Sequence, residues 1–253
     1  MRALHAALGL RQAFAAFAAD LRRTQGTILT MQVGLHAGLV VVSAIGSAGH
    51  TGDTALGFTS YLAEISALIN LGLDYLALGQ YERAVSSLSP TLERVQREAF
   101  GVHKWRWQIK LLIGLAKVHY AMGANEHALH AVEEGLKQAQ ATGSQKYVAK
   151  ACALRGKILL ILKQREAGGR ALQRAFRLVE HLHSPSLTYP IAYELGKWFE
   201  MTGNERQAAA LYGKAKATIE HMLAAVEDPA WQAPFRQSGP VQTILACAAG
   251  VGA

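Results

Sequence analysis

One short stretch of the sequence, Gly79-Gln-Tyr-Glu-Arg-Ala84, decides the fold because it returns twice further along the chain. It recurs as Gly123-Ala-Asn-Glu-His-Ala128 and as Gly203-Asn-Glu-Arg-Gln-Ala208, each with a Glu between the Gly and the Ala. A Gly between two stretches of helical periodicity is typical of a tight turn that joins two helices. The sequence therefore predicts helical hairpins that repeat along the chain.

A small residue in the helix before each turn fixes the length of the repeat. It recurs in steps of 44, 40 and 40 residues, as Gly72, Ala116, Gly156 and Gly196. Small residues at these positions let the two helices of a hairpin approach closely. The third unit lacks the turn motif, because Lys163 replaces the Gly and Gly168 replaces the Ala, but its spacing keeps it in the series. One hairpin cannot bury its apolar face alone, so we expect the units to stack.

These units resemble the tetratricopeptide repeat (TPR), with longer second helices or loops than the usual unit of about 34 residues. The predicted fold is mainly α, a TPR-like α-α superhelix of about four helix hairpins over residues 65–222. A small α+β fragment with a β-hairpin precedes it in residues 1–64. Capping helices and a tail follow in residues 223–253, where Asp228-Pro229 suits the start of a helix and Gly239-Pro240 should end it. A non-repetitive helical bundle is the alternative.

The composition of the 253 residues excludes several classes of protein. With 51% hydrophobic and 17% charged residues, the chain is too apolar for a disordered segment. Two cysteines, Cys152 and Cys247, make no disulfide framework, and no apolar run is long enough to span a membrane. We therefore expect a cytoplasmic protein without a membrane partner. An amphipathic N-terminal helix is favoured over a signal peptide.

The positive charge is concentrated in one block of the sequence. Residues 104–177 carry 14 Lys and Arg against 4 Glu, a net charge of +10, whereas the rest of the chain is net −2. Such a block attracts acidic partners, nucleic acid included. The alternative is an ordinary solvated face of several helices.

The N-terminal part of the sequence has a different pattern. Residues 27–46 are rich in β-branched side chains, and His36-Ala-Gly38 supplies a turn, which predicts a β-hairpin. A Gly-rich stretch, Gly46–Gly57, follows and is expected to be a loop.

Residues 1–66 also resemble the later half of a class III adenylate/guanylate cyclase domain. The resemblance rests on Gly34-Leu-His-Ala-Gly38, Ala44-Ile-Gly46 and Thr54-Ala-Leu-Gly57 with their spacing. Proteins of that family often join the cyclase domain to an ATPase domain and then to a TPR tail. The resemblance therefore implies a chain assembled from pieces of such a signalling protein.

The departures from the cyclase pattern imply that the chain is not an enzyme. Cyclases of this class need two metal-binding Asp residues on upstream segments, and here the only Asp before the Gly-rich stretch is Asp20. Their transition-state Asn and Arg correspond to Tyr61 and Ile65, and Thr54 alone matches, near the position that reads the base. The phosphate-binding loop of the ATPase is absent as well. We expect no catalytic residues, no metal and no cofactor.

The TPR resemblance implies a binding site, because in that family the first helix of each repeat lines the concave face. Two outward positions of this helix, seven residues apart and so on one face, hold lysines in successive repeats. They are Lys110, Lys117, Lys150, Lys157 and Lys197, with Tyr120 and Tyr193 beside them. We predict that this groove binds an acidic protein or peptide, the alternative being plain solvated lysines.

Two other functions remain open at this stage. The N-terminal part could regulate or complete an intact cyclase by pairing with a domain that carries the missing Asp residues. The basic block could bind nucleic acid, since Lys104-Trp-Arg-Trp107 combines basic and aromatic side chains. Against this, Trp105 is expected in the core of a repeat.

Overall fold

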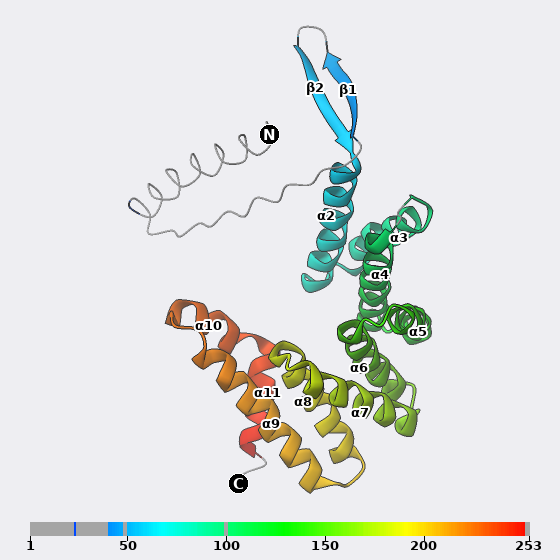
Figure 1. The fold of residues 1–253 in the computed structure, drawn as a ribbon. Coiled ribbons are helices and arrows are strands. Elements are labelled where there is room, and N and C mark those ends of the chain that lie inside the picture. The colour runs from blue at the N-terminus through cyan, green and yellow to red at the C-terminus, as the bar shows by residue number, and fades with distance from the viewer. Residues whose placement is uncertain (1–22, 24–39, 48–49, 99–100, 251–253) are drawn as a thin grey trace. The chain divides into compact units, whose positions relative to one another are not determined.

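The structure is a computed structural model that describes residue 23 and residues 40–47, 50–98 and 101–250 (Figure 1). Contacts between residues divide the chain into two compact units, Met1–Glu64 and Ile65–Ala253. In the first unit, β1 (Val40–Ser47) pairs antiparallel with β2 (His50–Gly57). The register runs from Val40 opposite Gly57 to Ser47 opposite His50.

This hairpin is not the one that the sequence predicts. The predicted turn at His36-Ala-Gly38 and the arm before it lie outside the described residues. The prediction of a loop over Gly46–Gly57 is wrong, because residues 50–57 form β2. Glycine weakens a strand, but the ladder with the Val-rich β1 supplies partners for its backbone N–H and C=O groups. The predicted hairpin over residues 27–46 is thus unconfirmed.

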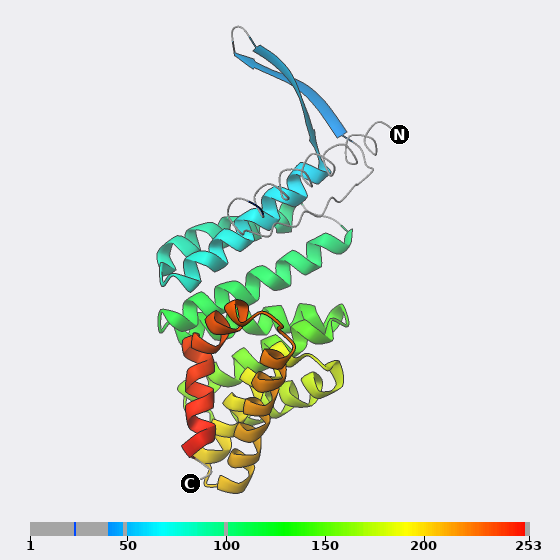
Figure 2. The ribbon, with the colours of Figure 1, turned by 90° about the vertical axis from the view of Figure 1, so that its left-hand side faces the viewer.

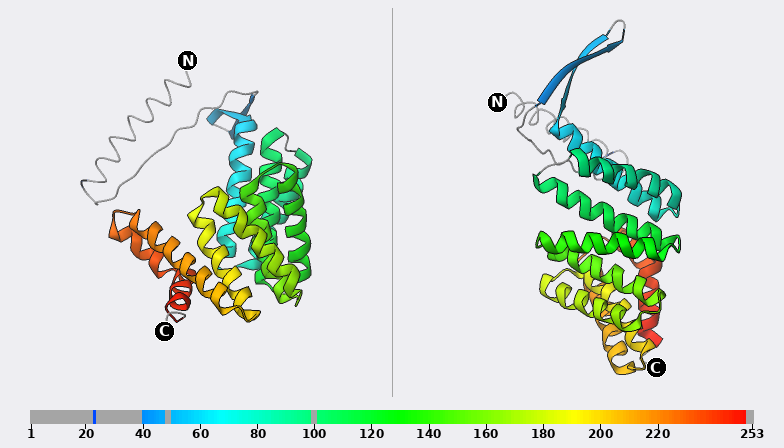
Figure 3. Two further views of the ribbon diagram at one scale, coloured as in Figure 1. Left: turned by 60° about the horizontal axis from the view of Figure 1, so that its bottom comes forward. Right: turned by 90° about the vertical axis from the view of Figure 1, so that its right-hand side faces the viewer.

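The second unit begins inside the first of a series of helices that form antiparallel pairs. The pairs are α2 (Phe58–Ala77) with α3 (Tyr81–Glu98), α4 (Gly101–Ala121) with α5 (Asn125–Ala141), α6 (Gln145–Ile161) with α7 (Arg165–Leu182), and α8 (Pro185–Met201) with α9 (Glu205–Ala224). Figure 3 shows the pairs from α4 to α9 stacked one on the next. From α4 to α9 the helices are 17 to 21 residues long, so the extra length of the repeat lies in the helices.

The turn inside each pair has the same backbone conformation. Gly79, Gly123 and Gly203 have φ between 71° and 77°, the left-handed region that glycine enters without steric cost. Lys163 takes the same place with φ 60°. Its N–H donates to the Leu160 carbonyl at 3.1 Å, as the N–H of Gly123 donates to the Tyr120 carbonyl. The prediction that the third unit is a repeat is therefore confirmed.

The two helices of a pair approach closely at the small residues. A Cβ added to Gly196 would lie 2.7 Å from the Tyr212 ring, and one added to Gly156 would lie 2.7 Å from Leu172. Gly168 faces Gly156, since a Cβ there would lie 3.1 Å from the Gly156 carbonyl oxygen. The distances at Gly196 and Gly156 are shorter than real Cβ contacts and that at Gly168 is tighter than most, so a larger residue would force the facing groups to shift.

The core runs through the stack rather than staying within single repeats. One cluster of buried side chains includes residues from five successive helices, among them Ile109, Val132, Ile158, Val179 and Ile191. The first helices contact one another across repeats, α4 with α6 and α6 with α8, whereas the second helices share fewer contacts. The first-helix side is therefore the inner face of the stack.

Two short helices complete the second unit. Asp228 caps α10 (Pro229–Gln237) by accepting a hydrogen bond from the Ala230 N–H at 2.9 Å, as the sequence predicts. Next, α11 (Gly239–Gly250) packs against α9 (Figure 2). It inserts Val241 and Ile244 into the core of the last repeat, where they are 1% and 2% exposed. Among the described helices, none has the length and apolarity that crossing a bilayer requires.

The left-handed conformation of Lys163 leads to a prediction about the free energy of unfolding. We expect Lys163→Gly to raise the free energy of unfolding by about 1 kcal/mol, because a residue with a Cβ is strained at this φ. Chemical denaturation monitored by circular dichroism measures the difference. Lys137→Gly, at an exposed position in the C-terminal half of α5, is the matched control and should lower the free energy of unfolding by up to about 1 kcal/mol. Destabilisation by both variants would contradict the strained turn.

Candidate functional site

The predicted lysines come together on the inner face of the stack. We name this surface, carried by α4, α6 and α8, the lysine groove. Besides burial, the charge of Lys157 lowers the pKa of Lys117, and the charges of Lys117 and Lys110 lower that of Lys150, so these ammonium groups lie close together. Lys157 and Lys197 share one partner, Glu194.

One end of the lysine groove is neutralised by the protein itself. The Glu194 carboxylate lies 2.9 Å from Lys157 Nζ and 3.5 Å from Lys197 Nζ, so it bridges α6 and α8. Its side chain is only 17% exposed, which strengthens the attraction relative to a fully solvated pair. An external anion would have to compete with this carboxylate at Lys157 and Lys197.

The other end has no such counter-charge. Lys110 Nζ donates to a neutral acceptor, Asn70 Oδ1, at 2.9 Å. Among the described residues, no carboxylate lies within ion-pair distance of Lys110, Lys117 or Lys150. At the α4–α6 end, positive charges from two successive repeats therefore lie together with no ion-pair partner in the described ranges.

The pKa values of these lysines reflect that crowding. Lys117 is exposed, but partial desolvation by the nearby protein still lowers the pKa of its ammonium, and the charge of Lys157 lowers it further. Partial burial lowers the pKa of Lys150 too, with added repulsion from Lys146, Lys117 and Lys110. A nearby anion would favour the charged form of each group.

Aromatic rings accompany the lysines. Lys157 Nζ lies 5.5 Å from the centre of the Tyr120 ring, and Lys197 Nζ lies 5.6 Å from that of Tyr193. Both distances suit cation–π attraction. Tyr193 also contacts α11 through Cys247 Sγ at 3.8 Å, and burial together with this hydrogen bond raises the pKa of Tyr193 to about 12. The terminal helix thus covers the Tyr193 end of the lysine groove.

Two further residues of this surface are not among those predicted from the sequence. Tyr147 lies under Lys150, with 5.7 Å between Nζ and the ring centre, and Lys146 adds to the charge around Lys150. Both precede Lys150 by three or four residues, the spacing that places side chains on one face of a helix. Helical spacing within α6 could therefore have identified them.

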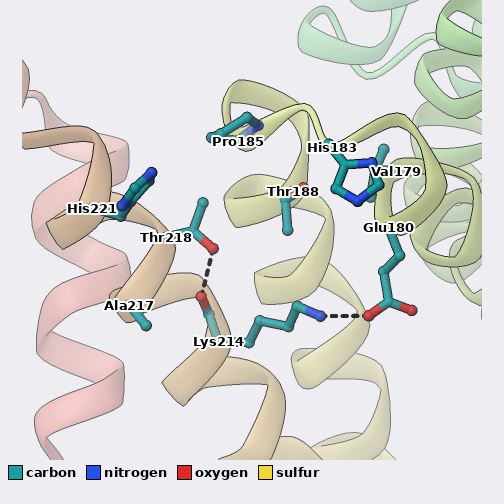
Figure 4. A pocket seen from close by; sticks show the side chains of 9 residues that line it. All are labelled: Val179, Glu180, His183, Pro185, Thr188, Lys214, Ala217, Thr218 and His221. Atoms are coloured by element: carbon teal, nitrogen blue, oxygen red, sulfur yellow. Dashed lines mark hydrogen bonds and ion pairs between the residues drawn. The ribbon is translucent and has the colours of Figure 1, made fainter. Parts of the chain in front are cut away.

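A depression of about 610 Å³ lies elsewhere, between α7, α8 and α9 (Figure 4). Glu180 and Lys214 form an ion pair across it, and Lys214 Nζ lies 5.1 Å from the centre of the Phe176 ring. His183 and His221 stand at its edges. Since the two charged side chains neutralise each other, this depression offers less to a charged ligand than the lysine groove.

The described part of the chain gives no support to a metal site or to a cyclase site. In the described part of the chain, no three His, Cys, Asp or Glu side chains gather as metal ligands would. Ile65, at the position of the cyclase transition-state Arg, is fully buried in the second unit. Thr54 lies in β2, and its side chain is outside the described part.

The basic aromatic strip is not a stacking platform for nucleic acid. Trp107 is buried, with 8% of its surface exposed, and Trp105 packs against the core. Lys104 Nζ donates to the Gln96 carbonyl at 2.8 Å. The aromatic rings therefore serve the packing of α4, as expected for Trp105.

Comparisons with known proteins identify the fold. No family model and no curated protein matches the sequence, so the cyclase resemblance of residues 1–66 stays a prediction. BtubC (BKLC) from P. vanneervenii is similar in structure, with a TM-score of 0.56, 18% identity and coverage of 76% of this chain and 79% of that one. A Podosopora anserina protein with nearly identical TPR-like repeats has a TM-score of 0.53, 15% identity and coverage of 76% and 95%. The fold is a TPR-like helical repeat.

A third similar structure has a ligand. It is PlcR from Bacillus thuringiensis in complex with the peptide PapR7 and DNA, with a TM-score of 0.54 and 17% identity, covering 60% of this chain and 54% of PlcR. At such identities the likeness shows the fold alone.

Repulsion inside the lysine groove can be measured directly. We expect Lys157→Met to raise the pKa of Lys117, because the variant removes the positive charge that disfavours its protonation. Titration of isotope-labelled lysines by NMR spectroscopy reports the change. Lys137→Met, on the exposed face of α5, is the control and should leave Lys117 as it is. An equal rise in both variants would show that the two ammonium groups do not interact locally.

Proposed function

We propose that the chain is a non-catalytic interaction module of a signalling protein, and that the lysine groove binds an acidic peptide segment of a protein partner. The observation that carries the proposal is the set of three lysines, Lys110, Lys117 and Lys150, held together with no carboxylate partner in the part of the chain that the structure describes. Holding like charges close together destabilises the folded state, and a bound carboxylate would relieve that cost.

The ion pairs of Glu194 in the neighbouring repeat indicate that such a ligand would supply a carboxylate. Glu194 joins lysines of two neighbouring repeats, and the equivalent position one repeat earlier, 40 residues back, holds Leu154. The α4–α6 end therefore has the lysines but lacks the carboxylate. A Glu or Asp side chain of a bound peptide would take the place that Glu194 takes between α6 and α8.

The neighbouring rings favour a peptide over a small anion. Tyr120 and Tyr147 line the same surface beside Lys157 and Lys150 and present apolar faces to a ligand. Tyrosine combines apolar contact area with a polar tip, which suits the binding of peptide segments. The PlcR–PapR7 complex supports peptide binding as a use of this fold, although it says nothing of acidity.

Charge reversal tests the proposal. We expect Lys117→Glu with Lys150→Glu to weaken binding of a fluorescent peptide of alternating Glu and Ala by at least about tenfold, because each lysine supplies a charge-assisted hydrogen bond. Fluorescence anisotropy measures the affinity. Arg170→Glu with Arg174→Glu changes the net charge by the same amount outside the lysine groove and should have little effect. An equal loss in both double variants would show that only net charge matters.

Removal of the internal carboxylate should have the opposite effect. We expect Glu194→Gln to strengthen binding of the same peptide severalfold, because it frees Lys157 and Lys197 for the ligand. The same change should lower the free energy of unfolding by up to about 1 kcal/mol. Anisotropy and denaturation together check the two signs. Weaker peptide binding by a folded Glu194→Gln variant would contradict a groove that competes for carboxylates.

A further inference from the structure

A second basic surface lies outside the lysine groove. A depression of about 260 Å³ between α5, α6 and α7 has three arginines in its wall, Arg155, Arg170 and Arg174. We name it the arginine pocket. Small side chains, Cys152, Ala167 and Ala171, leave the space between these arginines open.

Helical geometry separates this pocket from the lysine groove. Arg155 and Lys157 are two residues apart on α6, and at about 100° per residue they point to opposite sides of the helix. On α7, Arg170 and Arg174 are four residues apart and so lie on one face. The arginine pocket is therefore built from positions that play no part in the lysine groove.

Two arginines of the pocket have carboxylate partners that are not part of its lining. Glu133 meets Arg155 through Nε at 2.9 Å, and Glu166 lies 3.5 Å from Arg170 Nη1 with 90% of its side chain exposed. Neither carboxylate lines the pocket. Arg174 has a neutral neighbour, the Gln140 amide, whose oxygen can accept hydrogen bonds from both terminal nitrogens.

The charges of two arginines act on Cys152, a buried residue that lines the pocket. The Cys152 side chain is 1% exposed, and burial raises the pKa of its thiol. The charges of Arg174 and Arg155 act on the same thiol in the opposite direction, since both favour a thiolate. An anion that enters the pocket would meet this same attraction.

We propose that the arginine pocket binds a phosphate monoester group. Three guanidinium groups from two helices can meet a dianion with several parallel N–H···O bonds, the geometry in which arginine exceeds lysine. A carboxylate has one charge and one pair of oxygens, so a single guanidinium is sufficient for it. The volume is below the roughly 300–1,000 Å³ of pockets that enclose whole small molecules, so the phosphate enters while its carrier stays outside.

Calorimetric titration of the full chain tests this assignment with inorganic phosphate, phosphoserine, a short phosphoserine peptide, and acetate as the carboxylate control. We expect Arg174→Gln to weaken phosphate binding by at least about tenfold. Arg177→Gln is the matched control, because Arg177 is on the same helix but lines a different depression between α7, α8 and α9. Arg174→Lys retains the charge without the planar fork and should also weaken binding.

Several outcomes would overturn the proposal. These are the absence of saturable phosphate binding, acetate binding as tight as that of phosphate, an equal loss in Arg177→Gln, or full affinity in Arg174→Lys. Tighter binding of the phosphoserine peptide than of free phosphate identifies a phosphorylated protein as the source, and equal binding identifies a small phosphorylated molecule. Lys117→Glu with Lys150→Glu should leave phosphate binding unchanged, which separates this test from that of the lysine groove.

Discussion

The close approach of two helices inside each hairpin is the contact on which the rest of the structure depends. At Gly156, Gly168 and Gly196 an added Cβ would force neighbouring groups to shift, so the pairs α6–α7 and α8–α9 close tightly and present their remaining apolar faces to their neighbours. Because the hairpins stack with the same geometry, residues that are 40 positions apart occupy equivalent positions in successive repeats. The lysine groove is a product of that equivalence, since Lys117, Lys157 and Lys197 occupy one position in three repeats.

Helical rotation divides a single basic block of sequence into two chemically different surfaces. The lysines of α4 and α6 face inward, where they crowd beside tyrosine rings. Arg155 and the arginines of α7 gather on another side, around a small depression. An ammonium group is a compact point charge, whereas a guanidinium is a planar fork, and for this reason we propose different anions for the two surfaces. The net charge of the block, taken alone, does not distinguish them.

Much of the fold could be predicted from local sequence, because turn and packing positions depend on single residues. Gly79, Gly123 and Gly203 mark the turns, and even the exception, Lys163, takes the same conformation. The strand β2 could not be predicted, because the glycines of residues 46–57 have low strand propensity and their pairing with β1 is not local. Within the groove, the spacing predicted which lysines share a face. The neutralising role of Glu194 depends on distances between repeats, which no single helix reveals.

The packing of α11 on α9 makes the hairpin α8–α9 different from the hairpins before it. Val241 and Ile244 fill the apolar face that a fifth hairpin would otherwise use. A repeat inserted between α9 and α10 would have to reproduce that face for α11, whereas a duplication of the unit α6–α7 would present to its neighbours the same surfaces that they already contact. Lengthening of this array by duplication is therefore easier in its middle than at its last hairpin, and each such copy would add a further Lys150–Lys157 pair to the groove.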